Sequence, residues 1–189
     1  MILFVTFVIL FLILVNAFYV AAEFAAVSVR RNMIREMAEN GSRVAVHLLK
    51  ILENTKELDR YIAACQFGIT ISSLVLGAYG QVELAAYLFP LFERFGGMDS
   101  VMANSAAALV VLIGLTVFQV ILGELMPKSL ALQFPKQAAL YTYYPMRWTL
   151  AFFAWFIDFL NGSGLLLLKL FRLPPGGHQH IHSQQEINM

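Results

Sequence analysis

Three apolar stretches, each long enough to cross a lipid bilayer as an α-helix, constrain this 189-residue chain more than any other feature. They cover about residues 2–29, 61–90 and 101–126. About 20 predominantly apolar residues suffice for one crossing. A helix satisfies its own backbone hydrogen bonds, which water cannot do inside the hydrocarbon core. The sequence therefore predicts an all-α integral membrane protein with three transmembrane helices.

The composition fits a chain whose surface faces lipid. Charged residues make up 13% of it, whereas soluble domains carry roughly 25%. The formal net charge is +1 and the basic residues form no stripe with interleaved aromatics, so we expect no nucleic-acid partner. Cys65 is the only cysteine, which excludes an internal disulfide and a cysteine-based metal cluster. The sequence has no phosphate loop, nucleophile elbow or His-Glu-x-x-His motif, so we expect no enzymatic activity.

Basic residues beside the first stretch predict its orientation. Arg30 and Arg31 follow it directly, and positive charge next to a span marks the cytoplasmic side. We therefore expect the N-terminus outside and the C-terminus in the cytoplasm, in a plasma or inner membrane. Residues 31–56 carry more charge, with apolar residues at near-helical spacing around Gly41, which predicts two short amphipathic helices joined by a turn. These helices could lie on the inner membrane surface, pack against the neighbouring spans, or form a solvated connector with one apolar face.

The C-terminal juxtamembrane segment is expected at residues 136–170. Basic residues flank its apolar part, 148–170, on both sides, at Lys128, Lys136, Arg147, Lys169 and Arg172. Both ends are therefore expected in the cytoplasm, which predicts a helical hairpin or a re-entrant belt that bends at the glycines of residues 161–164. A fourth crossing is the alternative and would place the C-terminus outside. We interpret residues 1–172 as one membrane domain and the polar tail, residues 173–189, as the start of a further cytoplasmic region.

Two acidic residues and two serines within the apolar stretches are candidate ligands. Glu23 and Glu124 stand near the inner ends of the first and third stretches, at similar expected depth. An ionisable residue inside a span is costly and indicates a functional site by default. Ser72 and Ser73 lie near the middle of the second stretch. These groups offer oxygen atoms without sulfur or imidazole, which is the ligand set of a hard cation such as Mg²⁺ or Ca²⁺.

Pro127 adds a backbone group to this candidate site. A proline inside a helix has no N–H to donate to the carbonyl four residues earlier, which here belongs to Gly123. In lipid an unsatisfied carbonyl costs several kcal/mol, so a broken helix usually lines a cavity or a site. The sequence therefore predicts that the Gly123 carbonyl is available to a cation.

Each of these residues also has a purely structural interpretation. Glu124 and Lys128 are spaced to form an ion pair within one helix. The hydroxyls of Ser72 and Ser73 could bond back to carbonyls of their own helix. Glu23 could pair at the membrane edge with one of the arginines that follow it.

Four segments resemble a known family in their order and spacing. They are Ala-Ala-Glu-Phe-Ala at 21–25, Val-Ser-Val-Arg-Arg at 27–31, Gln-Phe-Gly-Ile-Thr-Ile-Ser-Ser-Leu at 66–74 and Gly-Glu-Leu-Met-Pro-Lys-Ser at 123–129. Together they resemble the DUF21 membrane domain of the CorC and cyclin M (CNNM) magnesium transporters. The resemblance covers nearly the whole chain, and the Gly-Glu-Leu-x-Pro-Lys element is its specific part.

The resemblance implies a homodimer with three transmembrane helices per subunit, juxtamembrane helices beneath them, and export of Mg²⁺ in exchange for Na⁺. It implies a π-type turn at the Gly-Glu-Leu-x-Pro-Lys element. The site residues that it carries over are Ser73 with Ser72 beside it, the Gly123 carbonyl, Glu124 and Pro127. Family members usually continue into a pair of CBS nucleotide-binding modules and a CorC-type domain, which are the implied cytoplasmic partners.

The contribution of the first helix stays open in this comparison. Glu23 occupies a position where cyclin M relatives carry a polar residue. Those relatives have a serine three residues earlier, where this chain has Val20. Ser28 is a distant substitute.

Three functions remain compatible with these residues. The first is a secondary transporter that binds Mg²⁺ through oxygens and alternates its access, with Na⁺ as the coupling ion. The second is a membrane sensor or scaffold that binds Mg²⁺ without moving it. The third is a dimeric membrane anchor whose polar residues only join helices.

Overall fold

A computed structural model describes residues 2–97 and 99–171. These residues are almost entirely helical and include no β-strand. The elements in chain order are α1 (Ile2–Ser28), α2 (Arg31–Glu39), α3 (Arg43–Glu53), α4 (Thr55–Gly96), α5 (Ser100–Phe118), the π-helix η1 (Gln119–Leu125), α6 (Met126–Gln133) and α7 (Pro135–Leu170). Within the described residues, three helical stretches are long and apolar enough to cross a membrane, namely Ile2–Ser28, Thr55–Arg94 and Ser100–Gln133. The expected all-α membrane protein with three such helices is confirmed.

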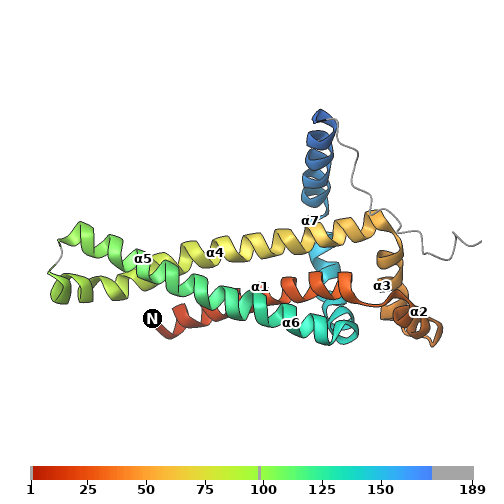
Figure 1. The fold of residues 1–189 in the computed structure, drawn as a ribbon, viewed down its shortest axis with the longest axis horizontal. Coiled ribbons are helices and arrows are strands. Elements are labelled where there is room, and N and C mark those ends of the chain that lie inside the picture. The colour runs from red at the N-terminus through yellow and green to blue at the C-terminus, as the bar shows by residue number, and fades with distance from the viewer. Residues whose placement is uncertain (1, 98, 172–189) are drawn as a thin grey trace, which may run out of the picture.

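The three long stretches form an elongated bundle. Figure 1 shows α1, α4 and α5 side by side, with η1 and α6 continuing the line of α5. The core between them is apolar and is formed by Val5, Ile9, Ile13, Leu76, Ala85, Ala107, Val111 and Leu115. A glycine permits the close approach of α4 to α5, because a Cβ built on Gly80 would lie 2.5 Å from Leu115 Cδ1. Small residues at such contacts are typical of helix packing in membranes, where van der Waals contact replaces the hydrophobic effect.

The α4 helix is longer than the apolar stretch that predicts it. It begins before that stretch, where the Asn54 side chain accepts hydrogen bonds from the backbone N–H groups of Lys56 and Glu57, as an N-cap does. It also continues through Pro90 to Gly96. Gly97, at φ +58°, then turns the chain into α5.

The helices α2 and α3 form a hairpin at one end of the bundle (Figure 1). Gly41 joins them at φ +88°, a left-handed conformation that glycine adopts without strain. Arg35 donates a hydrogen bond of 2.6 Å to Glu53 across the hairpin, and this carboxylate raises the pKa of the Arg35 guanidinium. The predicted pair of short helices with a turn at Gly41 is present.

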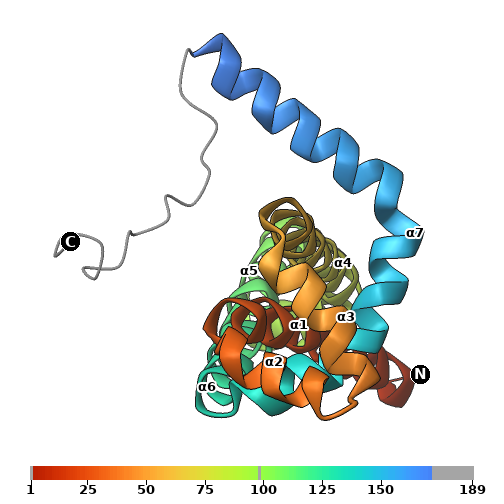
Figure 2. The same cartoon turned by 90° about the vertical axis from the view of Figure 1, so that its right-hand side faces the viewer.

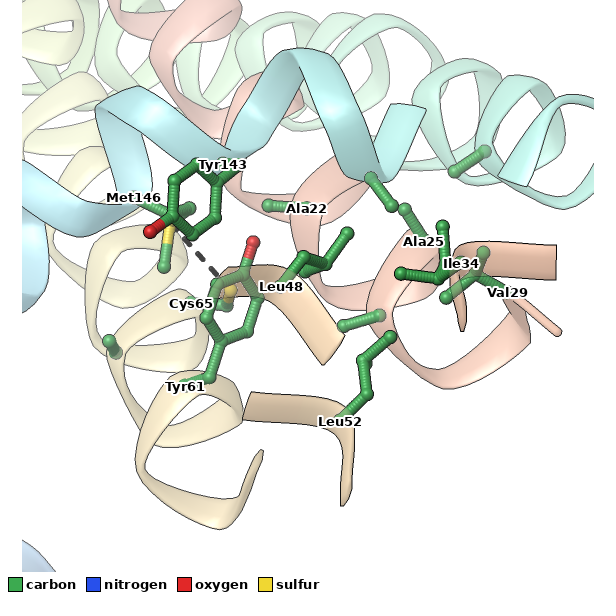
Figure 3. Packing of buried hydrophobic residues seen from close by; sticks show 14 of the residues in the cluster. Ala22, Ala25, Val29, Ile34, Leu48, Leu52, Tyr61, Cys65, Tyr143 and Met146 are labelled. Carbon is green, nitrogen blue, oxygen red and sulfur yellow. Dashed lines mark hydrogen bonds between the residues drawn. The ribbon is translucent and has the colours of Figure 1, made fainter. Parts of the chain in front are cut away.

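An apolar cluster fixes the hairpin to the bundle. Figure 3 shows Ile34 of α2 and Leu48 and Leu52 of α3 in one apolar cluster with Ala22 and Ala25 of α1. The same cluster includes Tyr61 and Cys65 of α4 and Tyr143 and Met146 of α7. The hairpin therefore packs on α1, α4 and α7 through its apolar side and is not a detached connector.

The long helix α7 runs across the bundle. Figure 1 shows it steeply inclined to the long axis, and Figure 2 shows its C-terminal part extending away from the other helices. Asp158 accepts a hydrogen bond of 2.9 Å from Arg60 at the start of α4. Phe67 packs against the rings of Phe153 and Phe156, with centroids 5.0 and 4.9 Å away. These contacts attach the middle of α7 to α4.

The expected hairpin or re-entrant bend at the glycines of residues 161–164 is wrong. The helix continues through Gly162 and Gly164 to Leu170. A glycine costs only about 1 kcal/mol relative to alanine inside a helix, so two of them do not force a reversal. Ser163 also donates a 2.8 Å hydrogen bond to the Phe159 carbonyl of the preceding turn. The polar tail at residues 173–189 lies outside the described residues.

Candidate functional site

The Asn16 amide joins three helical elements in the middle of the bundle. Its side chain is fully buried. Its Oδ1 accepts hydrogen bonds of 2.9 Å from the Ser72 hydroxyl and 3.1 Å from the Ser73 hydroxyl, both on α4. Its Nδ2 donates a 3.0 Å hydrogen bond to the carbonyl of Gly123 in η1. Gln119 of η1 in turn donates to the Ser73 hydroxyl. We call Asn16, Ser72, Ser73, Gln119 and Gly123 the oxygen cluster.

The π-helix η1 presents the backbone carbonyl of this cluster. Gly123 is buried within it, and Pro127 follows in the first turn of α6. A Cβ on Gly123 would lie 3.0 Å from Asn16 Nδ2, so glycine permits the close approach of the amide. Because Pro127 has no N–H to give to this carbonyl, Asn16 supplies a donor from another helix. The predicted π-type turn is present, and it begins before the Gly-Glu-Leu-x-Pro-Lys element, at Gln119.

The two serines differ in their contacts. The Ser72 hydroxyl lies 2.8 Å from the Gly68 carbonyl and 3.0 Å from the Ile69 carbonyl, in addition to its contact with Asn16. Its single hydrogen is therefore shared between its own helix and α1. Within the described residues, the Ser73 hydroxyl has no bond to its own helix and contacts only Asn16 and Gln119. The structural interpretation, a bond back to the helix, holds in part for Ser72 and not for Ser73.

Two candidate residues of the first helix lie away from the cluster. Glu23 follows Asn16 by seven residues, or about 10 Å along a helix, and its carboxylate accepts a 3.3 Å hydrogen bond from Gln66. No ion pair joins Glu23 to the arginines that follow it in the described part of α1 and α2. Ser28 bonds back to the carbonyl of Phe24. The structure therefore does not bring Glu23 or Ser28 to the oxygen cluster.

Glu124 follows Gly123 in η1, and its side chain is half-buried. In residues 2–97 and 99–171 its carboxylate has neither a hydrogen bond nor an ion pair. The alternative pair with Lys128 does not form, because the Lys128 ammonium lies over the Phe24 ring, 4.5 Å from its centroid. No group of three or more His, Cys, Asp or Glu side chains in the described chain is placed to hold a metal ion. Any cation at this point would therefore meet neutral oxygens and at most one nearby carboxylate.

The oxygen atoms of the cluster suit a hard cation once their side chains are reoriented. The Asn16 amide oxygen, the two serine hydroxyls and the Gly123 carbonyl are all oxygen ligands of the kind that Mg²⁺ takes. In this arrangement the amide hydrogens point at the Gly123 carbonyl. A cation can bind that carbonyl only after the amide has turned away.

Asn16 and Gln119 are the members that sequence reasoning missed. Both are neutral amides, whereas the predicted site residues were indicated by charge and by the resemblance to a family. A signal was available, because Asn16 is an isolated amide within a 27-residue apolar helix. Such a side chain needs hydrogen-bond partners from other helices.

Residues 7–189 match the family described as the Cyclin M transmembrane N-terminal domain. The chain belongs to the cyclin M (CNNM) family. This CNNM domain is 39% identical over 180 residues to the UPF0053 protein YhdT of Bacillus subtilis. The aligned region covers 94% of this chain and 38% of YhdT. It is 35% identical over 179 residues to the UPF0053 protein YrkA of the same organism, covering 94% of this chain and 40% of YrkA.

A more distant relative is the polyamine export protein of Haemophilus influenzae. It is 24% identical over 162 residues, which are 86% of this chain and 36% of that protein. The CNNM domain spans about two fifths of the length of the curated relatives it matches. The Gly-Glu-Leu-Met-Pro-Lys element, the specific part of the resemblance seen in the sequence, contains the end of η1 and the Gly123 carbonyl that contacts Asn16.

Proposed function

We propose that this CNNM membrane domain binds Mg²⁺ at the oxygen cluster and exports it across the bilayer in exchange for Na⁺. One observation carries the proposal. A fully buried asparagine on α1, two hydroxyls on α4 and a backbone carbonyl in a π-helix meet at one point between three helical elements. Buried polar groups are expensive inside a membrane, and π-helical turns occur frequently at functional sites.

The oxygen cluster in this arrangement represents the ion-free form. The Asn16 amide and the Gly123 carbonyl are only 3.0 Å apart, which leaves no room for an ion between them. Binding requires that the amide turns its oxygen inward and that the serine hydroxyls turn their lone pairs to the ion. Mg²⁺ then replaces hydrogen bonds that link the helices to one another, so occupancy changes how α1 is held against α4 and η1.

The charge at the site is small, which suits transport. Neutral oxygens bind Mg²⁺ less tightly than several carboxylates do, so the ion can be released. Glu124 supplies negative charge beside Gly123, and its carboxylate has no competing partner in the described chain. Pro127 prevents the reformation of an α-helical bond to the Gly123 carbonyl. Glu23 and Ser28 have no part in the binding step.

The orientation and assembly of the domain are part of the same proposal. Arg30 and Arg31, at the junction of α1 and α2, mark the cytoplasmic side, with the N-terminus outside. We place the domain in the plasma or inner membrane as a homodimer. CBS-pair and CorC-type cytoplasmic domains then act on it from the inner side.

Ion flux in proteoliposomes tests the proposal. Purified protein is reconstituted, and Mg²⁺ movement is followed with an enclosed fluorescent indicator, with and without a Na⁺ gradient. We expect Na⁺-driven Mg²⁺ flux that Ser73→Ala and Asn16→Ala abolish. Ser105→Ala is the matched control, because the Ser105 hydroxyl is exposed on α5 and bonds only to the carbonyl of Val101.

The outcomes separate the alternative functions. Mg²⁺ binding at the cluster without flux identifies a sensor or scaffold. Flux of spermidine in place of Mg²⁺ identifies a polyamine carrier, as the name of the Haemophilus relative suggests for that protein. If no cation binds to the protein or is moved by it, the polar residues serve only to join the helices.

A further inference from the structure

Tyr19 connects the α1 turn that carries Asn16 to two other helices. Its hydroxyl forms a 3.1 Å hydrogen bond with the Thr149 hydroxyl of α7, 130 residues away in the chain. Its ring covers Gly68 of α4, where a Cβ would lie 2.5 Å from two of the ring carbons. No side chain fits at Gly68 while the ring is in this position. Tyr19 is therefore held between α4 and α7 by one direct contact on each side.

The contact between Tyr19 and Gly68 lies about one helical turn from the oxygen cluster. Tyr19 follows Asn16 by three residues, about 4.5 Å along α1. The Gly68 carbonyl accepts a 2.8 Å hydrogen bond from Ser72, whose hydroxyl also contacts Asn16. A single helical turn moves as a unit, so α1 cannot separate from α4 at Asn16 unless the Tyr19 ring also leaves Gly68.

A cavity beside the Tyr19 ring can accept the ring when it leaves Gly68. This cavity has a volume of about 160 Å³ and is lined by Tyr19, Phe67, Gly68, Ser72 and Phe153, together with apolar side chains of α1 and α4. Its walls are almost entirely apolar, which suits an aromatic ring. The ring can therefore leave Gly68 without entering a polar environment.

Resting on the proposed function, we propose that Tyr19 and Thr149 form a latch that holds the oxygen cluster in its ion-free form and couples it to α7. Tyr19 is a positioning residue, because its hydroxyl contacts Thr149 and not a group of the cluster. Closing the latch keeps α1 against α4, which favours the Asn16 contact with Gly123. Releasing it lowers the cost of the rearrangement that admits the cation. Displacement of α7 at Thr149 then changes ion affinity from outside the three-helix bundle.

Two single substitutions remove the latch with little other change. Tyr19→Phe keeps the ring on Gly68 and deletes only the hydroxyl. The Thr149 hydroxyl retains an acceptor in this variant, the Pro145 carbonyl at 3.2 Å. Thr149→Val removes the other half of the bond. Tyr141→Phe on the exposed side of α7 and Thr116→Val, whose hydroxyl bonds back to its own helix, are the matched controls.

The first measurement is the Mg²⁺ dependence of flux by the full chain in proteoliposomes. Each latch variant is expected to lower the half-saturating Mg²⁺ concentration by about two- to tenfold, the range that corresponds to one hydrogen bond. The maximal rate is expected to change less than the half-saturating concentration. The double variant is expected to match either single variant, because two substitutions that break the same bond are not additive. Unchanged half-saturation, or additive effects, overturns the latch.

The second measurement does not depend on ion binding. Cys65, the only cysteine of the chain, is fully buried, with its Sγ 3.9 Å from Met146 Sδ of α7. Loosening α7 should expose it, so both latch variants are expected to react faster with a maleimide in Mg²⁺-free buffer than the unmodified protein and the two controls do.

The two measurements separate the two proposals. If the unmodified protein binds Mg²⁺ and the latch variants leave its affinity unchanged, the latch is overturned and the proposed function stands. If the unmodified protein neither binds nor moves Mg²⁺, the proposed function fails. The rate of Cys65 modification then decides whether the latch restrains α7. Equal rates in the unmodified protein, the latch variants and the controls overturn this restraint as well.

Discussion

Replacing Gly123 with alanine tests the geometry of the oxygen cluster directly. The new Cβ would lie 3.0 Å from Asn16 Nδ2 and 3.7 Å from Asn16 Cβ, so the amide has to move by a few tenths of an ångström or more. Asn16 has little room to retreat, because it is fully buried and Ser72 and Ser73 hold its oxygen. We therefore expect the Gly123→Ala variant to disturb all three hydrogen bonds of the amide.

The size of the effect follows from these bonds. Interhelical hydrogen bonds in membranes are worth about 0.6 kcal/mol on average, so three of them amount to about 2 kcal/mol. The alanine also stabilises the helix by about 1 kcal/mol relative to glycine. The free energy of unfolding of Gly123→Ala should thus fall by about 1 kcal/mol. The control Gly114→Ala, where no atom lies within 4 Å of the new Cβ, should raise it by about 1 kcal/mol.

Denaturant unfolding in detergent micelles, followed by helical circular dichroism, measures this gap of about 2 kcal/mol between the two variants. Mg²⁺ binding to the folded variants measures the functional effect. We expect the affinity of Gly123→Ala to fall at least about tenfold, or 1.4 kcal/mol, because the new Cβ occupies space beside the Asn16 amide that the amide needs in order to turn toward the ion. If Gly123→Ala matches Gly114→Ala in both stability and Mg²⁺ affinity, the close approach of the amide has no importance and the reasoning about the site is refuted.

Three further substitutions probe other parts of the same argument. Asn16→Leu should abolish Mg²⁺ binding and lower the free energy of unfolding by about 2 kcal/mol, whereas Asn104→Leu on the exposed side of α5 should change neither; equal effects would contradict a special role for the buried amide. Glu124→Gln removes a charge without changing shape, so Mg²⁺ affinity should fall several-fold in calorimetry with unfolding unchanged; an unaltered affinity would show that the carboxylate is too distant to act. Pro127→Ala restores an N–H that can bond to the Gly123 carbonyl, so thermal unfolding should shift upward while Mg²⁺ flux falls, and undiminished flux would show that the break is unnecessary.

The long helices were predictable because the bilayer leaves few alternatives. A span must be apolar and must bond its own backbone, so length and hydropathy suffice to find α1, α4 and α5. The turn at Gly41 was equally visible in sequence. The ends of α4 were not, because capping by Asn54 and the passage of the helix through Pro90 depend on local geometry that hydropathy does not register.

The site was predictable only in part, because the rotation of each helix about its axis decides which side chains point toward the cluster. Ser72, Ser73 and Gly123 were recognised, and the structure brings them together. Glu23 was expected at the same point because of its charge, yet it lies two turns along α1 and contacts Gln66. Asn16 was overlooked because a neutral amide inside a span looks like a minor interruption until its partners on other helices are known.

The bend that was expected in α7 shows the limit of composition as a guide. Glycines at 162 and 164 and positive charges on both sides indicated a reversal, but the helix continues. What holds α7 in place is a set of tertiary contacts, such as Arg60 with Asp158 and Phe67 with two aromatic rings. These contacts join segments about 90 residues apart in the chain, as the partner numbers show, and no local pattern announces them.

The π-helix also keeps the buried side of the third stretch turned toward the rest of the bundle along its whole length. From Ala103 to Ala131 the inward positions recur every four residues, with Gly123 and Pro127 among them. In an α-helix each such step overshoots a full turn by about 40°, so a uniform helix would carry its buried stripe progressively around its circumference. The wider turn at Gln119–Leu125 holds about one residue more than an α-turn and rotates the stripe back. Deleting one residue there would turn every later inward position by about 100°, and α6 would lose its contact with α1.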